Sequence, residues 1–463
     1  MNESTAPDNR PAVLILAHSW PPDANVGAVR PVYLSRQLAR LGLRPIVITV
    51  RDEYYELRNE SGISGSESAL VIRTKCLRHP RYAYLWMKKL AVRLLGNRNS
   101  APHIQTAQVG PLSDVRPFGS NLKANILSLL FTPDEFIGWF PFALAEAVRI
   151  VSKERPLCVI STGPPHSVHL TALVLNRLRR VPWIADLRDP WAWYDLPVDP
   201  PELWSDWMNA KLEKLMVRYA TRMVCVTPAV TTTYKDKYPD SPPDKWVTIP
   251  NGFDLDEFDG LGIVSRAERF TISYVGGFDH QRSPDLLLKA IAELISNGTL
   301  DPERIAVRFV GTCEYTNGRH TAALIREFGL SDIANVVSLL PRPQALRELL
   351  SAHVLLLLAG DHRLSVAAKV YEYLASGQPI LAISNEGSAA DIIRRTGAGR
   401  VVAPNDLEGA KSAIAHWYGN YLKSGSAIET GKPELSSATR EYSWDQLGAR
   451  YAELIQRAQP SGH

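Results

Sequence analysis

Short apolar runs recur along the chain, and each ends at glycine, proline or a polar residue. The first three read AVLILA at 12–17, PIVITV at 45–50 and LCVISTG at 157–163. Amphipathic stretches of helical length lie between most runs, such as VYLSRQLARLG at 32–42 and PDLLLKAIAELI at 284–295. Alternation of buried strands with helices is typical of parallel sheets that are covered on both faces. The pattern therefore predicts an α/β protein.

The runs form two groups, separated at 248–262 by TIPNGFDLDEFDGLG, whose Pro, Gly, Asn and Asp residues continue neither a helix nor a strand. A chain of 463 residues is long enough for two cores. We expect an N-terminal Rossmann-like domain over 1–250, with an insertion at about 52–133, and a C-terminal one over 251–435. Residues 436–463 are expected to add a helix that packs back on the N-terminal domain. Two such sheets facing a central cleft would bring the carboxyl ends of their strands together, where doubly wound sheets bind ligands.

The net charge of +4 is nearly balanced for this length and gives no reason to expect nucleic acid as a partner. Residues 73–98, however, contain eight lysines and arginines and no acid, and helical geometry would place an apolar stripe beside them. Such a helix would suit a peripheral contact with an anionic membrane, although packing on the N-terminal sheet is the alternative. No signal sequence or apolar run of about 18 residues is visible, and the four cysteines lack metal-binding spacing. We expect a cytoplasmic protein, peripheral on the inner membrane face if it contacts a membrane at all.

One stretch, PWIADLRDPWAWYD at 182–195, combines acids, an arginine and aromatic residues after a predicted strand. Hydroxyl groups of a ligand would be suitable partners for its polar groups, and tryptophan rings would stack on a flat ligand face. The structural alternative is a buried Asp–Arg brace with the tryptophans as core. In either case the stretch is predicted to form an N-terminal cleft wall, with its candidate residues being Asp186, Arg188, Asp189, Trp191 and Trp193.

Longer segments include IPNGFD at 249–254, SYVGGFDHQRSPDLLLKAI at 273–291 and VYEYLASGQPILAI at 370–383. Together with YSWDQL at 442–447 and the N-terminal segment starting HSWPPDANVGAVRP at 18, they resemble the retaining glycosyltransferases of family 4, which have the GT-B fold. The resemblance covers nearly the whole chain and is to the branch that serves bacterial surface polysaccharides such as lipopolysaccharide of the cell envelope. It implies a nucleotide-sugar donor, a sugar or lipid-linked acceptor, and no metal or other cofactor.

The diphosphate of such a donor gains charge as the glycosidic bond breaks, so its site needs fixed hydrogen-bond donors and cations. Gly276 and Gly277 follow an apolar strand and would let backbone amides approach a phosphate. Arg282 follows the same turn and would pair with phosphate oxygens. An ordinary strand-to-helix turn and a solvent-exposed arginine are the alternatives.

The segment LSVAAKVYEYLASG at 364–377 predicts a helix that starts near 365–367 and directs amides, with Ser365, at a phosphate. By resemblance, Glu372 is the second glutamate of the Glu-x7-Glu motif and binds the donor ribose, while Leu364 stands where the first glutamate would be. Lys369 is the expected substitute cation. Lys369 and Glu372 are three residues apart, so a surface ion pair between them is the alternative.

The resemblance also implies roles for three N-terminal residues. His166 matches a histidine that faces the cleft, and Gly27 and Arg30 match a first glycine loop that reaches the donor phosphates. A core or helix-capping histidine and a helix-surface arginine are the alternatives. The candidate catalytic residues are Lys369, Arg282 and His166. Arg30 is a further candidate for the N-terminal cleft wall.

The combined interpretation is a retaining, metal-independent glycosyltransferase that serves a polysaccharide or glycolipid precursor. A nucleotide-sugar epimerase on the same fold and a non-catalytic GT-B binding protein are the alternatives. The only Asp-x-Asp triplet, Asp254–Asp256, lies in the predicted linker, which argues against a metal-dependent transferase.

Overall fold

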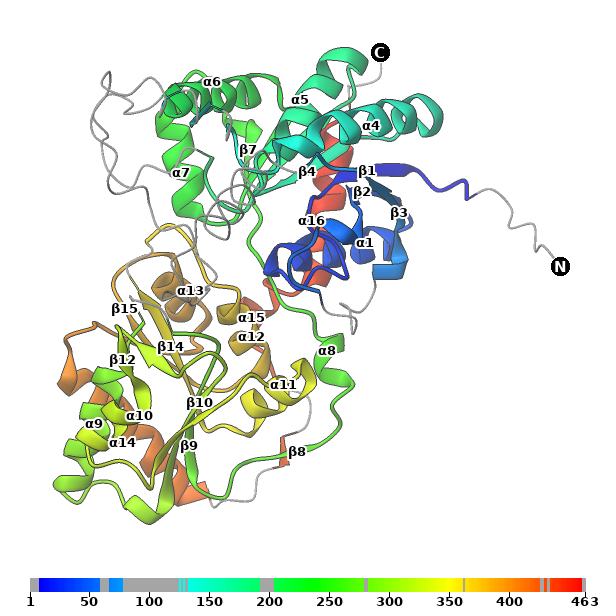
Figure 1. Ribbon diagram of the computed structural model, residues 1–463. Coiled ribbons are helices and arrows are strands. Elements are labelled where there is room, and N and C mark those ends of the chain that lie inside the picture. The colour runs from blue at the N-terminus through cyan, green and yellow to red at the C-terminus, as the bar shows by residue number, and fades with distance from the viewer. Residues whose placement is uncertain are drawn as a thin grey trace, which may run out of the picture. The chain divides into compact units, whose positions relative to one another are not determined.

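The computed structural model describes residues 8–58, 66–77, 125, 128–129, 132–191, 204–278, 282–360, 363–424, 429–430 and 434–459. The chain forms two compact units, each with its own parallel sheet (Figure 1). The first unit comprises Met1–Val224, Asp240–Val247 and Ala452–His463, and the second comprises Cys225–Pro239 and Thr248–Tyr451.

The first sheet has seven strands in the order β3-β2-β1-β4-β5-β6-β7. Neighbours from β3 to β5 pair in parallel, and the strand order reverses between β1 and β4. In open α/β sheets, ligands bind at the carboxyl ends of the strands that flank such a reversal. The strands are β1 Ala12–Leu16, β2 Arg44–Val50, β3 Leu70–Thr74, β4 Val159–Gly163, β5 Trp183–Leu187, β6 Arg222–Cys225 and β7 Trp246–Thr248. Longer helices along this part of the chain are α1 Val29–Arg40, α4 Phe140–Glu154, α5 Ser167–Arg179, α6 Trp204–Tyr219 and α7 Pro228–Lys237.

The second sheet has six parallel strands in the order β13-β10-β9-β14-β15-β16, and its order reverses between β9 and β14. Strand β14 explains why the apolar runs are continuous: Leu356 and Leu358 enter one core cluster, while Leu355 and Leu357 enter another. Successive side chains of a strand point to opposite faces, so a strand covered on both faces needs apolar residues at every position. The strands are β9 Phe270–Val275, β10 Ile305–Val310, β13 Ala334–Val337, β14 Val354–Gly360, β15 Ile380–Ser384 and β16 Gly399–Val402.

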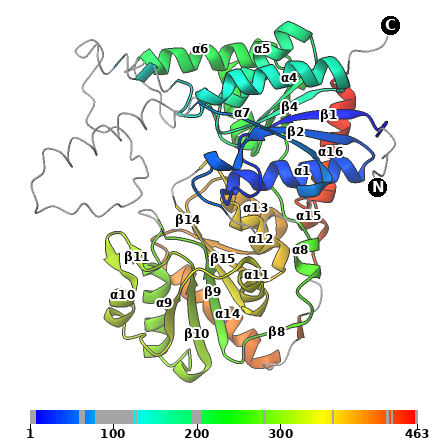
Figure 2. The ribbon, with the colours of Figure 1, turned by 45° about the vertical axis from the view of Figure 1, so that its right-hand side comes forward.

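Helices cover both faces of this second sheet (Figure 2). One core cluster contains residues of α9, α10 and α14, and the other contains residues of α8, α11, α12 and α13. The helices along this part of the chain are α8 Asp256–Asp259, α9 Asp285–Ser296, α10 Thr321–Glu327, α11 Arg342–Ser351, α12 Lys369–Ser376, α13 Ser388–Thr396, α14 Leu407–Ser424, α15 Ser437–Arg440 and α16 Trp444–Arg457, and α16 belongs to the first unit from Ala452 onward. Two short antiparallel ribbons pair β8 Val264–Ser265 with β17 Glu429–Thr430, and β11 Tyr315–Thr316 with β12 Arg319–His320. The predicted class, α/β with two Rossmann-like parallel sheets, is confirmed.

The predicted linker is more ordered than its composition suggests, because it contains α8. The carboxylate of Asp254 accepts a hydrogen bond from the backbone N–H of Asp256 (3.2 Å), and Phe258 is buried in a core cluster. The composition of 248–262 did not predict this short helix, which is stabilised by the bond from the Asp256 N–H to the Asp254 carboxylate and by one buried aromatic residue.

The basic segment at 73–98 is described only in part. Arg73 lies on the edge strand β3, where its guanidinium pairs with Asp52 (2.5 Å). Residues 78–98, which contain the apolar stripe of the predicted amphipathic helix, lie outside the described residues. Among the helices that the structure describes, none combines the length and the apolarity that crossing a bilayer requires.

Candidate donor and acceptor sites

The second sheet presents Gly276 at the carboxyl end of β9, where the strand order reverses. Gly276 has φ +144°, and a Cβ at this position would lie 2.5 Å from Nζ of Lys369. The absence of a side chain therefore allows the Lys369 ammonium to approach the turn directly. Two predicted donor-site residues, ninety-three positions apart in the sequence, are thus brought together within one unit.

Tyr274 holds this ammonium in place. Lys369 Nζ donates to the Tyr274 hydroxyl (2.6 Å) and lies 4.1 Å from the centroid of its ring. The same hydroxyl donates to the carbonyl of Gly277 (2.5 Å), and the Tyr274 side chain is buried. A cation that contacts both the hydroxyl and the face of a buried aromatic ring has a restricted position. One tyrosine thus connects the cation to the glycine turn.

Helix α12 is also attached to β9 directly. The Tyr373 hydroxyl accepts from the backbone N–H of Val275 (2.8 Å), and Tyr373 is fully buried. Lys369 and Tyr373 are four residues apart, so they lie on the same face of α12. This face therefore sets the distance between α12 and the glycine turn.

The start of α12 differs from the prediction. The helix begins at Lys369 and not near 365–367, so Ser365 lies in the preceding loop. The carbonyl of Leu364 accepts hydrogen bonds from the hydroxyls of Thr227 (2.8 Å) and Ser388 (3.3 Å). If α12 began earlier, this carbonyl would accept a hydrogen bond from a backbone N–H of the helix. It accepts from two hydroxyls instead, which explains why the helix begins only at Lys369.

Glu372 of α12 pairs with a residue that was not among the predicted candidates. Arg342 Nη1 donates to Glu372 Oε1 (2.9 Å), and the Glu372 side chain is 29% exposed. The other edge of the guanidinium contacts Glu257, with Nε to Oε1 at 2.9 Å and Nη2 to Oε2 at 2.7 Å. Glu372 thus makes its ion pair with Arg342, whereas the expected alternative was a pair with Lys369.

Arg282 belongs to the loop that follows the glycine turn. It is partly buried, and its backbone carbonyl accepts from the hydroxyl of Thr316 (3.3 Å). Arg282 therefore lies in the stretch of chain that leads from the glycine turn to α9.

In the first unit, Asp186 and Arg30 form a buried ion pair with exposed side-chain fractions of 0% and 3%. Arg30 donates through Nε (2.9 Å to Oδ2) and Nη2 (2.9 Å to Oδ1), and the Thr162 hydroxyl donates to Oδ2 (2.7 Å). A bidentate pair with a further hydrogen bond stabilises two charges that would be costly to bury alone. Asp186 is thus part of a buried brace, but its partner is Arg30, from outside the 182–195 stretch, and Arg30 is not the helix-surface arginine of its own alternative.

Arg188 connects two loops at the carboxyl edge of the first sheet. Its Nη1 donates to the carbonyl of Gly27 (2.7 Å) and its Nη2 to that of Pro164. A Cβ at Gly27 would lie 3.0 Å from Nη1, so a glycine suits this approach. Burial lowers the pKa of Arg188, while the carboxylates of Asp186 and Asp189 oppose that shift.

Histidines and a tryptophan form a cluster beside Arg188. The rings of His166 and Trp191 stack at 5.1 Å between centroids and 8° between planes, and His169 lies 5.8 Å from both rings. Burial, reinforced by Arg188, lowers the pKa of His166 to about 3 and that of His169 well below its ordinary value. Both imidazoles are therefore neutral at pH 7, so His166 is available there as a hydrogen-bonding group and not as a cation. Trp193 lies outside the described residues.

Asp134 is a buried polar residue that the sequence analysis missed. Its carboxylate accepts from the backbone N–H groups of Ser167 (2.8 Å) and Phe136 (3.0 Å), and burial raises its pKa. Ser167 begins α5, so Asp134 supplies a cap to that helix from a distant segment. Only the tertiary fold brings it there, and no local sequence pattern predicts such a contact.

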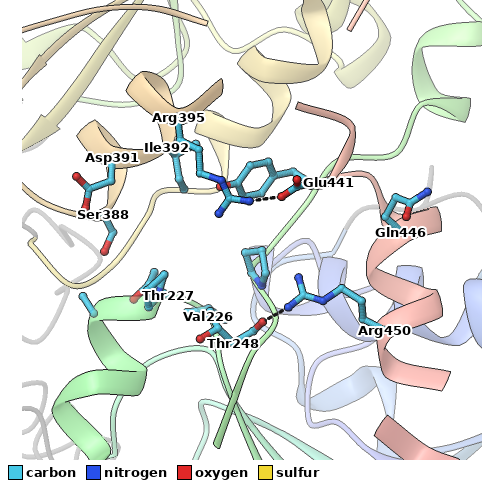
Figure 3. A pocket seen from close by; sticks show the side chains of 14 residues that line it. Val226, Thr227, Thr248, Ser388, Asp391, Ile392, Arg395, Glu441, Gln446 and Arg450 are labelled. Atoms are coloured by element: carbon cyan, nitrogen blue, oxygen red, sulfur yellow. Dashed lines mark hydrogen bonds and ion pairs between the residues drawn. The ribbon is translucent and has the colours of Figure 1, made fainter. Parts of the chain in front are cut away.

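The second unit also contains a cavity of about 450 Å³ (Figure 3). The residues that line it do not include the glycine turn. Arg395 pairs with Glu441 on one side, and Arg450 donates to the carbonyl of Thr248 on the other. Thr227 and Ser388, which hold the carbonyl of Leu364, are part of its lining. Its lining carries two arginines and two acids, so the charges of these groups give no indication of a ligand class.

Comparisons with known proteins agree with this architecture. Residues 27–252 match the family model of a glycosyl transferase 4-like domain, and residues 269–420 match that of glycosyl transferases group 1. A search of curated proteins gave no match.

Solved structures share the fold at low sequence identity. A glycosyltransferase from Rickettsia africae ESF-5 aligns with a TM-score of 0.59 at 14% identity, covering 98% of this chain and 100% of the other. HepE of Anabaena, solved in complex with UDP, aligns with a TM-score of 0.58 at 12% identity over 96% of this chain and 100% of HepE. WaaB, a lipopolysaccharide outer core galactosyltransferase, aligns at 0.54 with 9% identity over 96% of this chain and 99% of WaaB. The fold and the two matched domains define the class: this chain is a glycosyltransferase of the GT-B type.

Proposed function

We propose that the enzyme is a retaining, metal-independent glycosyltransferase that uses a nucleotide-sugar donor. The observation that carries the proposal is the approach of the Lys369 ammonium to Gly276 at the reversal of the second sheet. A cation and a side-chain-free turn at the carboxyl edge of a parallel sheet suit a diphosphate. The structural neighbour HepE was solved in complex with UDP, which supports a nucleotide-containing donor.

In the proposed mechanism, Lys369 and Arg282 stabilise the charge that develops on the leaving diphosphate. Fixed cations accelerate a reaction most when the negative charge that they stabilise is larger in the transition state than in the ground state. Gly276 and Gly277 follow β9 and Ser365 lies between β14 and α12, so their backbone groups follow the carboxyl ends of two neighbouring parallel strands. Because the leaving phosphate itself is available to take the acceptor proton, no general base opposite the leaving group is required.

Glu372 is proposed to bind the donor ribose. A carboxylate accepts hydrogen bonds from two vicinal hydroxyls, and Glu372 is partly exposed on α12, three residues after Lys369. Leu364, at the position of the first glutamate, has no charge. Lys369 is proposed to stabilise the diphosphate in place of that glutamate.

The first unit is proposed to contribute the loop at Gly27 and the acceptor side of the reaction. Neutral His166, Asp189 and the stacked Trp191 are the groups suited to sugar hydroxyls and sugar faces. Arg30, Asp186 and Arg188 keep the supporting loops in position through their buried bonds.

The acceptor is proposed to be a polysaccharide or glycolipid precursor of the cell envelope. The lipopolysaccharide enzyme WaaB among the structural neighbours and the basic segment at 73–98 support this choice. A lipid-linked acceptor would place the enzyme on the cytoplasmic face of the inner membrane, with the basic segment in contact with anionic lipid.

The test uses a panel of UDP-, GDP-, ADP- and TDP-sugars, with purified enzyme and membrane-extracted or synthetic lipid-diphosphate acceptors, with and without EDTA. The expected result is transfer of one sugar with the anomeric configuration of the donor, measured by NMR of the product, at a rate that EDTA leaves unchanged. Inversion of the anomeric centre would refute retention. Loss of activity on chelation, restored by a divalent cation, would refute metal independence. Free epimerised sugar without transfer would refute the proposal as a whole.

A further inference from the structure

Arg342 is the first residue of α11 and lies between two carboxylates from other helices. It contacts Glu257 of α8 through Nε and Nη2, and Glu372 of α12 through Nη1. Its own side chain is 46% exposed, whereas those of Glu257 and Glu372 are 14% and 29% exposed. The guanidinium thus covers two less exposed acids.

The position of this arginine is unfavourable for the helix that carries it. The N-terminal turn of a helix has a partial positive charge and favours acids over cations. Helix α11 contains no acid in its first turn and begins with this arginine after Pro341. The two carboxylates outside α11 offset that cost, so the residue is explained by its partners and not by helix stability.

The guanidinium donates two hydrogen bonds to Glu257 and one to Glu372. Glu257 accepts from two adjacent donors, and this bidentate geometry fixes the plane and rotation of the guanidinium. The remaining Nη1 then reaches Oε1 of Glu372. Within the described part of the chain, the Oε2 atom of Glu372 makes no hydrogen bond, and it is the atom left for a ligand. The arrangement therefore orients the carboxylate without occupying both of its oxygens.

We propose that Arg342 is a positioning residue for the donor ribose, acting through Glu372, and that Glu257 orients Arg342. This inference rests on the proposed role of Glu372 in nucleotide binding. One bond to Arg342 holds the Glu372 side chain in one rotamer before the nucleotide arrives, which reduces the ordering that binding requires. Two acids and one arginine leave a net negative charge, which favours acceptance of hydrogen bonds from hydroxyl groups.

The test compares ribose and deoxyribose nucleotides, because a role through Glu372 depends on the ribose hydroxyls. Dissociation constants are measured by calorimetry for UDP, ADP and GDP and for their 2′-deoxy forms, with the wild type, Arg342→Gln and Glu372→Gln. The matched control is Arg347→Gln, which changes an exposed arginine of the same helix. Circular dichroism checks folding, and Arg342→Lys, which keeps the charge but lacks the fork, serves if Arg342→Gln does not fold.

The wild type is expected to bind the preferred ribonucleotide about tenfold more tightly than its 2′-deoxy form, and Glu372→Gln to lose that preference. Arg342→Gln should weaken ribonucleotide binding about two- to fivefold and leave 2′-deoxynucleotide binding unchanged. Arg347→Gln should change neither. A merely structural brace would weaken both kinds of nucleotide equally.

The failures of the two proposals are distinguishable. If Glu372→Gln abolishes the ribose preference but Arg342→Gln retains it, weakens both kinds of nucleotide equally or tightens binding, the positioning role of Arg342 is overturned. If the wild type binds nucleotides without preferring ribose, the role of Glu372 is overturned, and the role of Arg342 with it. If the wild type binds none of the six compounds, the proposed nucleotide-dependent function fails.

Discussion

Gly276 combines a positive φ with a close approach by a side chain. Alanine there would have φ +144° and a Cβ close to the Lys369 ammonium. Gly276→Ala is expected to destabilise the protein by about 1 kcal/mol through backbone strain, and also to displace Lys369 and weaken nucleotide binding about tenfold or more. The measurement is the dissociation constant of the preferred nucleoside diphosphate, together with the thermal midpoint.

Gly298→Ala is the matched control. Gly298 has φ +75°, but no atom of the described residues lies within 4 Å of the position that a Cβ would take there. The variant should lower the thermal midpoint to a similar extent and leave the dissociation constant unchanged. Equal loss of binding in the two variants would contradict the proposed role of Gly276.

His169 predicts a dependence of stability on pH. The histidine is fully buried, its Nδ1 lies 2.8 Å from the Ser161 hydroxyl, and burial lowers its pKa well below its ordinary value. Below the unfolded pKa of about 6.5, the unfolded chain binds a proton at this site and the folded chain does not. The free energy of unfolding should therefore fall as the pH falls, by up to about 1.4 kcal/mol per pH unit from this residue.

His169→Gln removes this contribution. The variant should be less stable at pH 7, since it disturbs a buried hydrogen bond, but its urea midpoint should fall less steeply between pH 6 and pH 4.5 than that of the wild type. His416→Gln, at an exposed position of α14, is the control and should keep the wild-type slope. An unchanged slope in His169→Gln would show that this histidine is protonated in the folded state.

At the scale of elements, the attachment of α12 to β9 depends on the hydroxyl of Tyr373. Tyr373→Phe leaves the backbone N–H of Val275 without its side-chain partner. The expected loss is about 1–3 kcal/mol of unfolding free energy, with faster hydrogen exchange at the Val275 amide. Tyr238→Phe, which changes a partly buried ring outside this contact, is the control. Wild-type exchange at Val275 in Tyr373→Phe would contradict the assignment.

The elements themselves were largely predictable from the sequence, and their contacts were not. Strands covered on both faces require continuous apolar runs, so β9, β14 and β15 were recognisable. The start of α12 was misplaced because two hydroxyls from distant segments hold the carbonyl of Leu364. Backbone groups satisfied by tertiary contacts leave no periodic signal in the local sequence.

The candidate-site residues also include some that were predictable from the sequence and some that were not. Gly276 and Lys369 were expected on one side of a site because motif resemblance and the strand-to-helix pattern both pointed there, and the fold brings them together. Tyr274 and Arg342 were missed, since a tyrosine inside a strand and an arginine at a helix start look like ordinary core and surface residues. Their proposed roles depend on contacts with residues that are distant in the sequence, which are Lys369 for Tyr274 and Glu372 for Arg342.

At the scale of the whole molecule, the residues proposed to bind the nucleotide belong mainly to the second unit. A nucleoside diphosphate at about 100 times its dissociation constant should stabilise the state that binds it by about 2.7 kcal/mol. Hydrogen exchange with and without the nucleotide should therefore show the strongest protection at 274–277 and 369–376. Strongest protection among the strands of the first sheet would contradict this assignment.

The order in which the chain leaves the ribosome has a consequence for the first unit, because that unit includes Ala452–His463. Leu454 and Ile455 are buried, and Gln459 donates to the carbonyl of Leu157 (2.8 Å). About two hundred residues of the second unit are synthesised before this last segment emerges. The first unit, although encoded first, is therefore complete only after its final helical turns have been synthesised, and until then the contacts that bury Leu454 and Ile455 are not formed.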